Sequence, residues 1–291
     1  MRNIDDHGQA LVRTGNLRAS SRLGSAVPRP ARRTERGRAR EPPPHVRRPG
    51  GGSAARAPED AVLCGTTAAW VHGVDQATAG HPIEVGARHG RRVRSVDGRI
   101  SRGRTFRPVD VQDSDWGLIT TPARTAYDLA RDPVLLRSVP RLDALVRSTG
   151  LVTAEVWPVV EHNPGARWIT AVPRTLDLVD PGAESVRESS LRVLLALEGF
   201  PRLVAQHDLH DVAGAFVARL DLAHPELRVG VEYDGAYHLD PVQAATDRVR
   251  RARVRANGWG LLVVDNALFG QRETLFAAVA DLFDRARRPG W

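Results

Sequence analysis

The sequence predicts an α/β protein whose C-terminal part has the element order α-β-β-β-α-β-α and a mixed sheet. Three observations support this prediction. From residue 176 onward, helix-start residues, alternating strand segments and turn residues follow one another regularly. Residues 59–175 contain a shorter and less regular set of such segments, which predicts a small α+β domain. Residues 1–58 have few large apolar side chains and predict a disordered tail.

This N-terminal tail holds most of the net positive charge of the 291-residue chain. The formal net charge is +8, and every one of the 42 basic residues is an arginine. Residues 1–58 contain 13 arginines and four acids, whereas residues 176–291 contain 14 arginines and 17 acids. The tail is compatible both with simple disorder and with an arginine-rich arm that adds salt-dependent affinity for phosphate. Net charge alone is therefore weak evidence for nucleic-acid binding.

The composition also excludes several classes of protein. Cys64 is the single cysteine, so an intramolecular disulfide framework and a cysteine-based zinc site are both excluded. No apolar run approaches the roughly 18–20 residues of a membrane span. The first residues lack the apolar region of a signal peptide. We therefore expect a cytoplasmic protein.

The segment 59–175 shows separate helix and strand signals. Thr121 followed by Pro122 is typical of a helix start and predicts a helix over 122–131. The other expected elements are a short helix beginning near Thr66 or Thr67, strands at 81–85 and 93–100, short helices at 141–147 and 153–160, and a linker at 163–175.

The segment 176–291 has the stronger pattern. Asp180 followed by Pro181 predicts a helix start, and Gly199 predicts its end. The expected strands are 203–209, 216–223, 227–235 and 261–265, and the expected later helices are 241–256 and 271–287. An apolar stripe on the first of these helices predicts its buried face, through Val242, Ala245, Val249, Ala252 and Ala256.

Three carboxylates of the second and third strands point to one patch of this sheet. Glu232 and Asp234 are two residues apart and therefore share a face of their strand. A hairpin turn at Glu226-Leu227 places Asp221 directly opposite Glu232, and a turn one residue pair earlier places it on the diagonal. Because carboxylates this close repel one another, something must neutralise them. A divalent cation with oxygen ligands, such as Mg²⁺, is the obvious candidate.

Two further side chains are candidates for this patch. Glu188 lies on the helix stripe of Leu191 and Leu195, which should face the sheet. It forms a capping-box pattern with Ser185, so a helix cap and a site residue are equally good interpretations. His238 follows the third strand and is either a general base or water-positioning group, or a solvated loop residue.

The helix over 241–256 is rich in arginine. Asp247, Arg251 and Arg255 follow at spacings of four, with Arg248 adjacent. One interpretation is an exposed face held by salt bridges. The other is a row of arginines that contacts phosphate beside the carboxylates.

As a set, these motifs resemble one known nuclease family. The segment 183–265 is similar to the very-short-patch-repair (Vsr)-like endonuclease domain of the PD-(D/E)XK superfamily, which has a restriction-endonuclease-like core. The family pattern runs S-x-x-E, R-x-D-L-A-x-P, V-x-V-E-Y-D-G-x-x-H, D-x-x-R and G-W. The matching segments here are Ser185 to Glu188, Arg219 to Pro225, Val229 to His238, Asp247 with Arg250 or Arg251, and Gly258-Trp259.

The resemblance implies a Mg²⁺-dependent phosphodiesterase, with Mn²⁺ as a possible substitute. It implies Asp221 and Glu232 as the principal metal ligands and Glu188 as an accessory ligand. Asp234 and His238 would complete the catalytic set. The superfamily's usual lysine is replaced here by Asp234, so His238 or an arginine, Arg219 or Arg251, would have to take its role.

The N-terminal half resembles the abortive-infection type IV antitoxin-like proteins. The matching segments are CGTTAAWVHGV (64–74) and ITTPARTAYDLA (119–130). The resemblance implies a winged-helix-like DNA-binding start. Residues 88–107 contain eight arginines and one acid, which favours nucleic-acid contact over a merely solvated ribbon. The arginines expected to bind nucleic acid are Arg91, Arg92, Arg94, Arg102 and Arg104, together with Arg248 and Arg251 of the later helix.

Two functions remain open on the sequence. The first is a Mg²⁺-dependent endonuclease that cuts DNA in repair or defence, with residues 59–175 as a DNA-recognition domain and 176–291 as the nuclease. The alternative is a non-catalytic antitoxin-like or transcriptional regulatory DNA-binding protein whose nuclease fold is vestigial. The expected partners are DNA and a toxin or a repair or defence protein.

Overall fold

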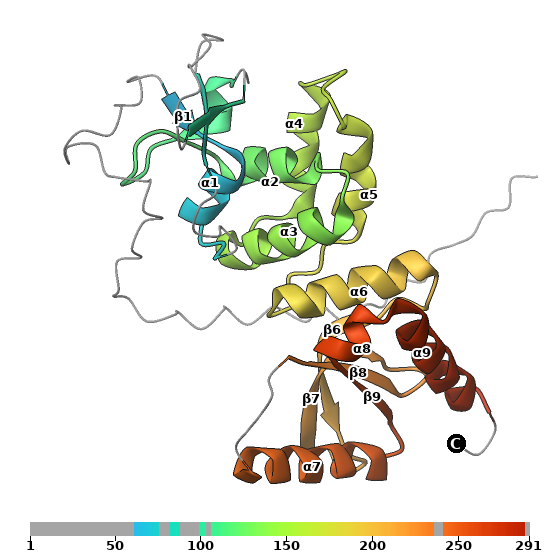
Figure 1. The fold of residues 1–291 in the computed structure, drawn as a ribbon. Helices are drawn as coiled ribbons and strands as arrows, with labels where there is room; N and C mark the ends of the chain where they lie inside the picture. The colour runs from blue at the N-terminus through green and yellow to red at the C-terminus, as the bar shows by residue number, and fades with distance from the viewer. Residues whose placement is uncertain (1–60, 76–81, 88–98, 103–105, 236–240, 289–291) are drawn as a thin grey trace, which may run out of the picture. The chain divides into compact units, whose positions relative to one another are not determined.

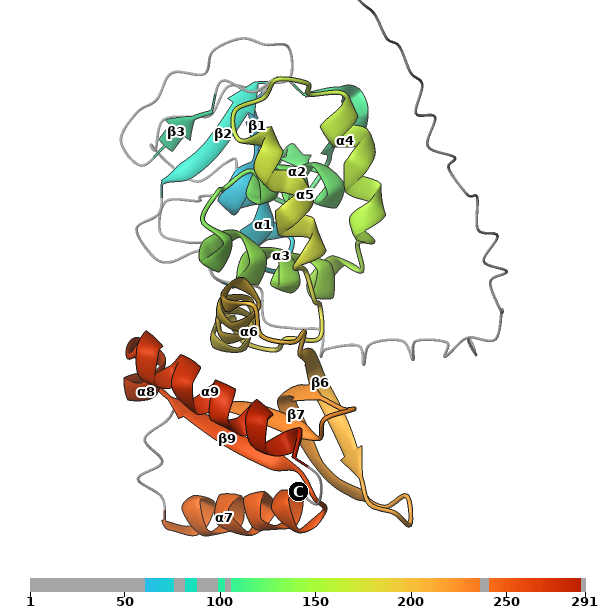
Figure 2. The same cartoon turned by 90° about the vertical axis from the view of Figure 1, so that its right-hand side faces the viewer.

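The computed structural model describes residues 61–75, 82–87, 99–102, 106–235 and 241–288 (Figures 1 and 2). The predicted tail, 1–58, lies outside these described residues. The α/β fold class is confirmed, because helices combine with two mixed β-sheets. Among the described residues, no helix has both the length and the apolar character needed to cross a membrane.

The first sheet has five strands in the order β3-β2-β1-β5-β4. They are β1 (Ala61–Leu63), β2 (Ile83–Ala87), β3 (Arg99–Ser101), β4 (Val111–Gln112) and β5 (Ile119–Thr120). β1 pairs antiparallel with β2 and parallel with β5, so the sheet is mixed. β3, where the predicted strand 93–100 ends, lies parallel to β2.

Five α-helices accompany this sheet in the described part of the chain. They are α1 (Gly65–Val71), α2 (Pro122–Ala130), α3 (Leu135–Thr149), α4 (Trp157–Glu161) and α5 (Val172–Asp177). Three short 3-10 turns occupy Pro108–Asp110, Thr153–Val156 and Ile169–Ala171. α2 begins as predicted, because the Thr121 hydroxyl accepts a hydrogen bond from the Arg124 amide at 3.4 Å. The core of these helices includes the fully buried Tyr127, Leu142 and Leu145.

Three predictions for this region were wrong in their boundaries. α3 is twice as long as the predicted helix at 141–147 and passes through Pro140, which lacks an amide donor. The buried side chains of Val139 and Leu142 on either side hold the helix together across it. The expected linker at 163–175 instead holds a 3-10 turn and the start of α5, whose Val172 and Leu176 are buried in the same core. α1 begins at Gly65 with Cys64 as N-cap, ahead of the predicted threonine caps.

The second sheet has four strands in the order β6-β7-β8-β9. They are β6 (Val204–His210), β7 (Phe216–His224), β8 (Val229–Asp234) and β9 (Gly260–Asp265). β6, β7 and β8 are antiparallel neighbours, and β9 is parallel to β8. The accompanying helices are α6 (Val186–Glu198), α7 (Pro241–Ala256), α8 (Asn266–Gly270) and α9 (Arg272–Ala286). The predicted α-β-β-β-α-β-α order is observed, with α8 as an additional short helix.

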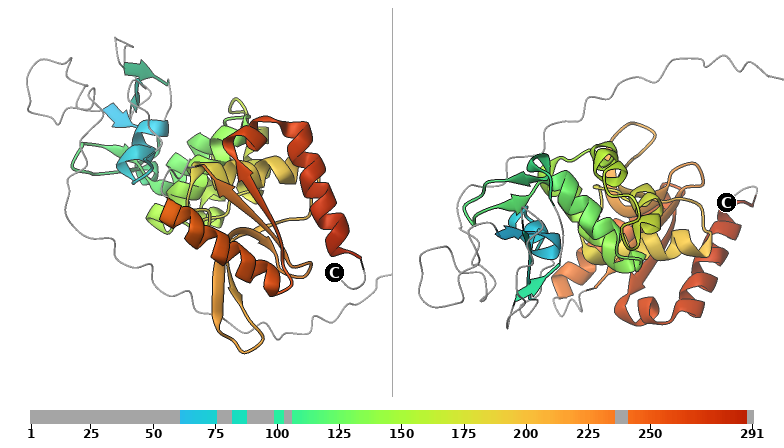
Figure 3. Two further views of the ribbon diagram at one scale, coloured as in Figure 1. Left: turned by 60° about the horizontal axis from the view of Figure 1, so that its bottom comes forward. Right: turned by 90° about the horizontal axis from the view of Figure 1, so that it is seen from above.

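Helices cover both faces of this sheet (Figures 2 and 3). α6 and α9 pack on one face, where Leu191, Leu195 and Leu275 join a core with the strands. α7 packs on the other face through the buried Val254, which shares a separate cluster with Trp259. The carboxylate-bearing strands β7 and β8 therefore lie between the two helical layers.

Two helix predictions in this region were wrong in detail. α6 begins at Val186 with Ser185 as its N-cap, while Asp180 instead accepts a hydrogen bond from the Gly182 amide. On α7 the described side chains of the predicted apolar stripe face away from the sheet: Ala245, Val249, Ala252 and Ala256 are exposed, Val249 at 63%. The side of α7 that turns toward the sheet presents Arg250 and, deeper, Val254. The ion pairs between arginines of α7 and carboxylates of the sheet determine which side of this helix faces the sheet. A hydropathy pattern does not include such ion pairs.

A buried ion pair links α3 to α6. The Arg192 guanidinium on α6 donates to a carboxylate oxygen of Asp143 on α3 at 2.8 Å, and the two side chains are 4% and 1% exposed. Arg192 also donates to the Leu178 carbonyl at 2.7 Å, and the Asp180 amide donates to Asp143 at 2.8 Å. The antitoxin-resembling half and the carboxylate-bearing half are therefore joined by a buried ion pair with additional hydrogen bonds to the backbone.

Candidate functional site

The register of β7 and β8 brings Asp221 beside Glu232. The observed pairs are Leu222–Val231, Ala223–Gly230 and His224–Val229, and one further step along the strands aligns the two acids. The Tyr233 amide donates to Asp221 Oδ2 at 2.9 Å, which fixes that carboxylate against β8. Of the two predicted registers, the direct pairing is therefore the correct one.

Asp221 and Glu232, with Glu188 of α6 beside them, form what is called the carboxylate row below. Gln206 of β6 lies next to this row, on the other side of β7. The neighbouring pairs Ala205–Leu222 and His207–Leu220 place Gln206 across from Asp221. Its backbone has φ 53°, a left-handed conformation that is uncommon for any residue other than glycine. Gln206 was not among the predicted site residues, because a polar residue in an edge strand gives no local signal of a site.

Glu188 of α6 combines the two roles that the sequence left open. Its amide donates to Ser185 Oγ at 3.1 Å, so the helix start is capped as the pattern indicated. Its carboxylate oxygen Oε2 accepts from the Glu184 amide and from Gln206 Nε2, both at 2.9 Å. Glu188 is buried and faces the strands, so the capping residue also contributes a negative charge to the row.

The environment of Asp221 disfavours its ionised form. Burial, assisted by the nearby negative charges of Glu188 and Glu232, raises the pKa of the Asp221 carboxyl to about 6, against the opposing effects of the Tyr233 amide and Arg250. Perturbed carboxyl groups of this kind are concentrated at functional sites, although structural charge networks also produce them. Asp221 is the centre of the cluster, because it lies between acids from α6 and β8.

Arginines of α7 neutralise the other acids of the row. Arg250 donates to both oxygens of Glu232, at 2.5 and 2.8 Å, and Glu232 is only 4% exposed. Arg251 donates to Asp234 at 2.7 Å and lies 3.8 Å from Glu232. Glu232 and Asp234 therefore share the face toward α7, as predicted. The hydrogen bond to Glu232 raises the pKa of Arg250 still further, so this cation stays charged.

As it stands, this arrangement does not fit a metal centre with three carboxylate ligands. Among the described residues, no group of three or more His, Cys, Asp or Glu side chains could hold a metal ion. The physical reason is visible at Glu232, whose two oxygens are both taken by Arg250. Asp221 and Glu188 do have the hard oxygen donors that Mg²⁺ prefers.

The other predicted site residues are dispersed. Arg219 forms a two-bond ion pair with Asp208 at 2.6 and 2.9 Å and is committed to that exposed partner. Arg102 pairs with Glu84, and Arg248 is exposed on α7. The residues that lie outside the described part of the chain are His238, Arg91, Arg92, Arg94 and Arg104. Arg250 was also missing from the predicted site residues, although the nuclease-family pattern matched Asp247 with either Arg250 or Arg251.

Comparison with known proteins decides the family. Two curated relatives are the uncharacterized proteins Rv2248 and MT2308, from the H37Rv and CDC 1551 strains of Mycobacterium tuberculosis. Each is 32% identical to the chain over 237 residues, which cover 79% of this chain and 84% of the relative. The chain belongs to the Rv2248 family. No solved structure matches it.

Within this Rv2248-family chain, residues 61–178 match the family model of the AbiEi antitoxin C-terminal domain. This match confirms the antitoxin-like resemblance of the N-terminal half. It ends before α6 and the carboxylate-bearing strands begin. The similarity to Rv2248 is longer than this match, so it includes residues outside the antitoxin-like segment.

Proposed function

We propose that the chain is an antitoxin-like regulatory protein whose partners are DNA and a toxin. The match of residues 61–178 to the AbiEi antitoxin C-terminal domain carries this proposal. The separate buried core around Tyr127 and Leu142 supports it, because a binding module needs its own stable interior. In this proposal the acids beside α7 are a vestige of a nuclease fold, with Arg250 compensating Glu232 and Arg251 compensating Asp234.

DNA binding by the full chain tests this proposal. We expect the purified protein to bind DNA from directly upstream of its own coding sequence about 1,000-fold more tightly than a shuffled sequence, at about 150 mM salt. Fluorescence anisotropy measures both affinities. Asp221→Asn should bind as tightly as the wild type, because the acid row has no role here. Equal affinity for the two DNAs would count against regulatory binding.

The convergence of Glu188, Asp221 and Glu232 favours a second candidate function, a metal-dependent endonuclease. These acids come from a helix and two neighbouring strands, and burial, together with the charges of Glu188 and Glu232, raises the pKa of Asp221. A divalent cation binding at Asp221 and Glu188 would relieve that repulsion. Glu232 could contribute only after Arg250 released it, with a DNA phosphate as the natural alternative partner of the arginine.

Cleavage of supercoiled plasmid with Mg²⁺ or Mn²⁺ tests the second candidate. We expect nicking by the wild type and its loss in Asp221→Asn and Glu188→Gln. Asp208→Asn is the matched control, since this acid lies in the same sheet but pairs with Arg219 outside the row. Calorimetric titration with Mn²⁺ should show binding that Asp221→Asn abolishes. A wild type that neither binds Mn²⁺ nor cuts DNA would exclude this function.

A further inference from the structure

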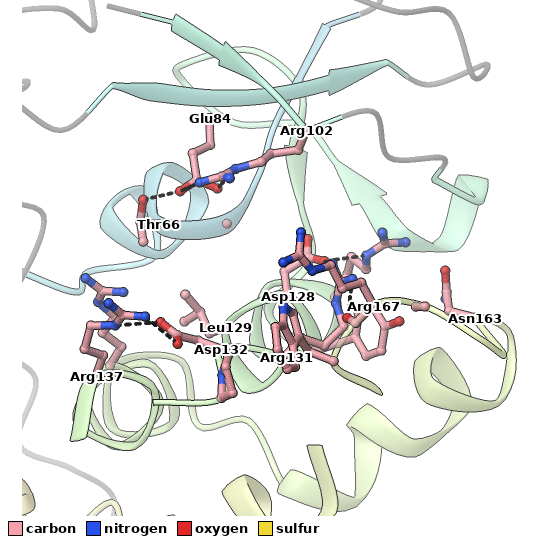
Figure 4. A pocket seen from close by; sticks show the side chains of 17 residues that line it. Thr66, Glu84, Arg102, Asp128, Leu129, Arg131, Asp132, Arg137, Asn163 and Arg167 are labelled. Atoms are coloured by element: carbon pink, nitrogen blue, oxygen red, sulfur yellow. Dashed lines mark hydrogen bonds and ion pairs between the residues drawn. The ribbon is translucent and has the colours of Figure 1, made fainter. Parts of the chain in front are cut away.

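A second polar site lies entirely within the antitoxin-like segment, away from the carboxylate row. A cavity of about 680 Å³ opens between α1 and β2 on one side and α2, α3 and residues 163–168 on the other (Figure 4). Its volume falls within the range of small-molecule binding sites, which is about 300–1,000 Å³. The proposed functions assign no role to this cavity.

The walls of the cavity are strongly basic. Six arginines from several segments of the chain line it, against three acids: Arg102, Arg124, Arg131, Arg137, Arg141 and Arg167. Some of this charge is compensated within the walls. Arg102 pairs with Glu84 at 2.9 Å, and Arg137 pairs with Asp132 at 2.8 Å (Figure 4). Arg124 is buried and lies 3.1 Å from Asp110 behind the wall.

Two of these arginines are not held by a direct ion pair in the described part of the chain, although Arg141, after Arg137, helps to lower the pKa of the nearby Asp132 carboxyl. Neither Arg141 nor Arg167 forms an ion pair with any residue that the structure describes. Arg141 lies one helical turn beyond Arg137 on α3, so the two guanidinium groups approach the cavity from the same helix. Guanidinium groups bind phosphate oxygens through paired hydrogen bonds. The cavity therefore favours an anionic ligand, and phosphate in particular.

An aromatic side chain lies at the same cavity. Trp168 lines it and is 49% exposed, and the Arg167 guanidinium lies 5.2 Å from the centre of its ring. The Trp168 backbone has φ 65°, a strained conformation that surrounding contacts must maintain. An exposed indole beside an arginine is a surface on which a nucleobase stacks.

We propose that this cavity binds a nucleotide. The phosphate groups contact Arg141, and the base stacks against Trp168 beside Arg167. The volume of this site lies within the range of small-molecule sites, which a single nucleotide fits. The antitoxin-like segment then carries a small-molecule site in addition to its macromolecular partners.

Isothermal titration of the full chain with ATP, GTP, CTP and UTP tests the proposal, with inorganic phosphate as the minimal probe. We expect saturable binding of at least one nucleotide with one site per chain. Arg141→Gln should weaken it at least tenfold. Trp168→Ala should weaken nucleotide binding at least tenfold and leave the weaker binding of phosphate unchanged.

A matched control distinguishes nucleotide binding in the cavity from nonspecific binding to the arginines of the protein surface. Arg285→Gln removes an exposed arginine of α9 that pairs with Asp281, and it should bind nucleotide as the wild type does. Thermal unfolding of each variant checks that it remains folded. Absence of saturable nucleotide binding, binding that Arg141→Gln leaves unchanged, or binding of single-stranded oligonucleotides alone would each overturn the proposal.

Discussion

Replacing Arg192 with methionine is expected to lower the free energy of unfolding by about 3–5 kcal/mol, because it leaves the Asp143 carboxylate buried without its cation. Asp143 is fully buried, and burial already raises the pKa of its carboxyl against the opposing effect of Arg192. Without the guanidinium that pKa rises further. The loss should therefore be larger at pH 8, where the carboxyl must be charged, than at pH 5. Urea unfolding at the two pH values measures it.

Two further variants make this expectation specific. Arg285→Met removes an exposed ion pair with Asp281 and should cost less than about 1 kcal/mol. The double variant Arg192→Met with Asp143→Leu should recover much of the loss, because apolar side chains of similar size often replace a buried ion pair without cost. If Arg192→Met alone is as stable as the wild type, the α3–α6 ion pair does not stabilise the fold.

Replacing Asp221 with asparagine is expected to stabilise the protein at pH 8. The pKa of this carboxyl rises from 3.8 to about 6 in the folded state, so folding favours its protonated form. The wild type should therefore lose stability as the pH rises from about 4 through 6, by roughly 3 kcal/mol for a shift of this size. The asparagine amide has no charge to repel Glu188 or Glu232 and can still accept from the Tyr233 amide, so this loss should disappear.

Urea unfolding in EDTA between pH 4 and pH 8 measures the difference. The two curves should coincide near pH 4 and separate as the pH rises. Asp208→Asn is the control of opposite sign, since hydrogen bonds from Arg219 lower the pKa of Asp208 and its charge is favourable in the fold. Equal stability of wild type and Asp221→Asn at pH 8 would show that neither burial nor the neighbouring acids destabilise the Asp221 carboxylate.

Local patterns predicted much of the C-terminal part. Strand alternation correctly placed Glu232 and Asp234 on one face, and the predicted helix at 241–256 has the bounds of α7. The apolar periodicity predicted the wrong buried face for α7, where ion pairs and apolar packing favour different sides of the helix. It predicted that the alanine- and valine-rich side of α7 is buried. Apolar periodicity takes no account of the two arginines of this helix that bind carboxylates on β8.

Two helix starts were predicted wrongly for a related reason. The predicted helix at 141–147 begins after Pro140, yet α3 begins at Leu135 and continues through this proline, with Val139 and Leu142 fully buried on either side. Asp180-Pro181 is a good helix start by composition, but the Asp180 carboxylate accepts from the Gly182 amide and from Ala205 on β6. In both cases contacts outside the local window outweigh the local preference.

The sequence by itself determined the α/β class, the order of elements after residue 176, the shared face of two carboxylates and the antitoxin-like character of the N-terminal half. These depend on residues within one or two turns or strands of each other. Only the tertiary structure placed Gln206 opposite Asp221, assigned Arg250 to Glu232, joined Arg192 to Asp143 and assembled the arginine-lined cavity. Each of these juxtapositions joins residues from separate elements, and the packing of whole helices and strands decides which of them meet.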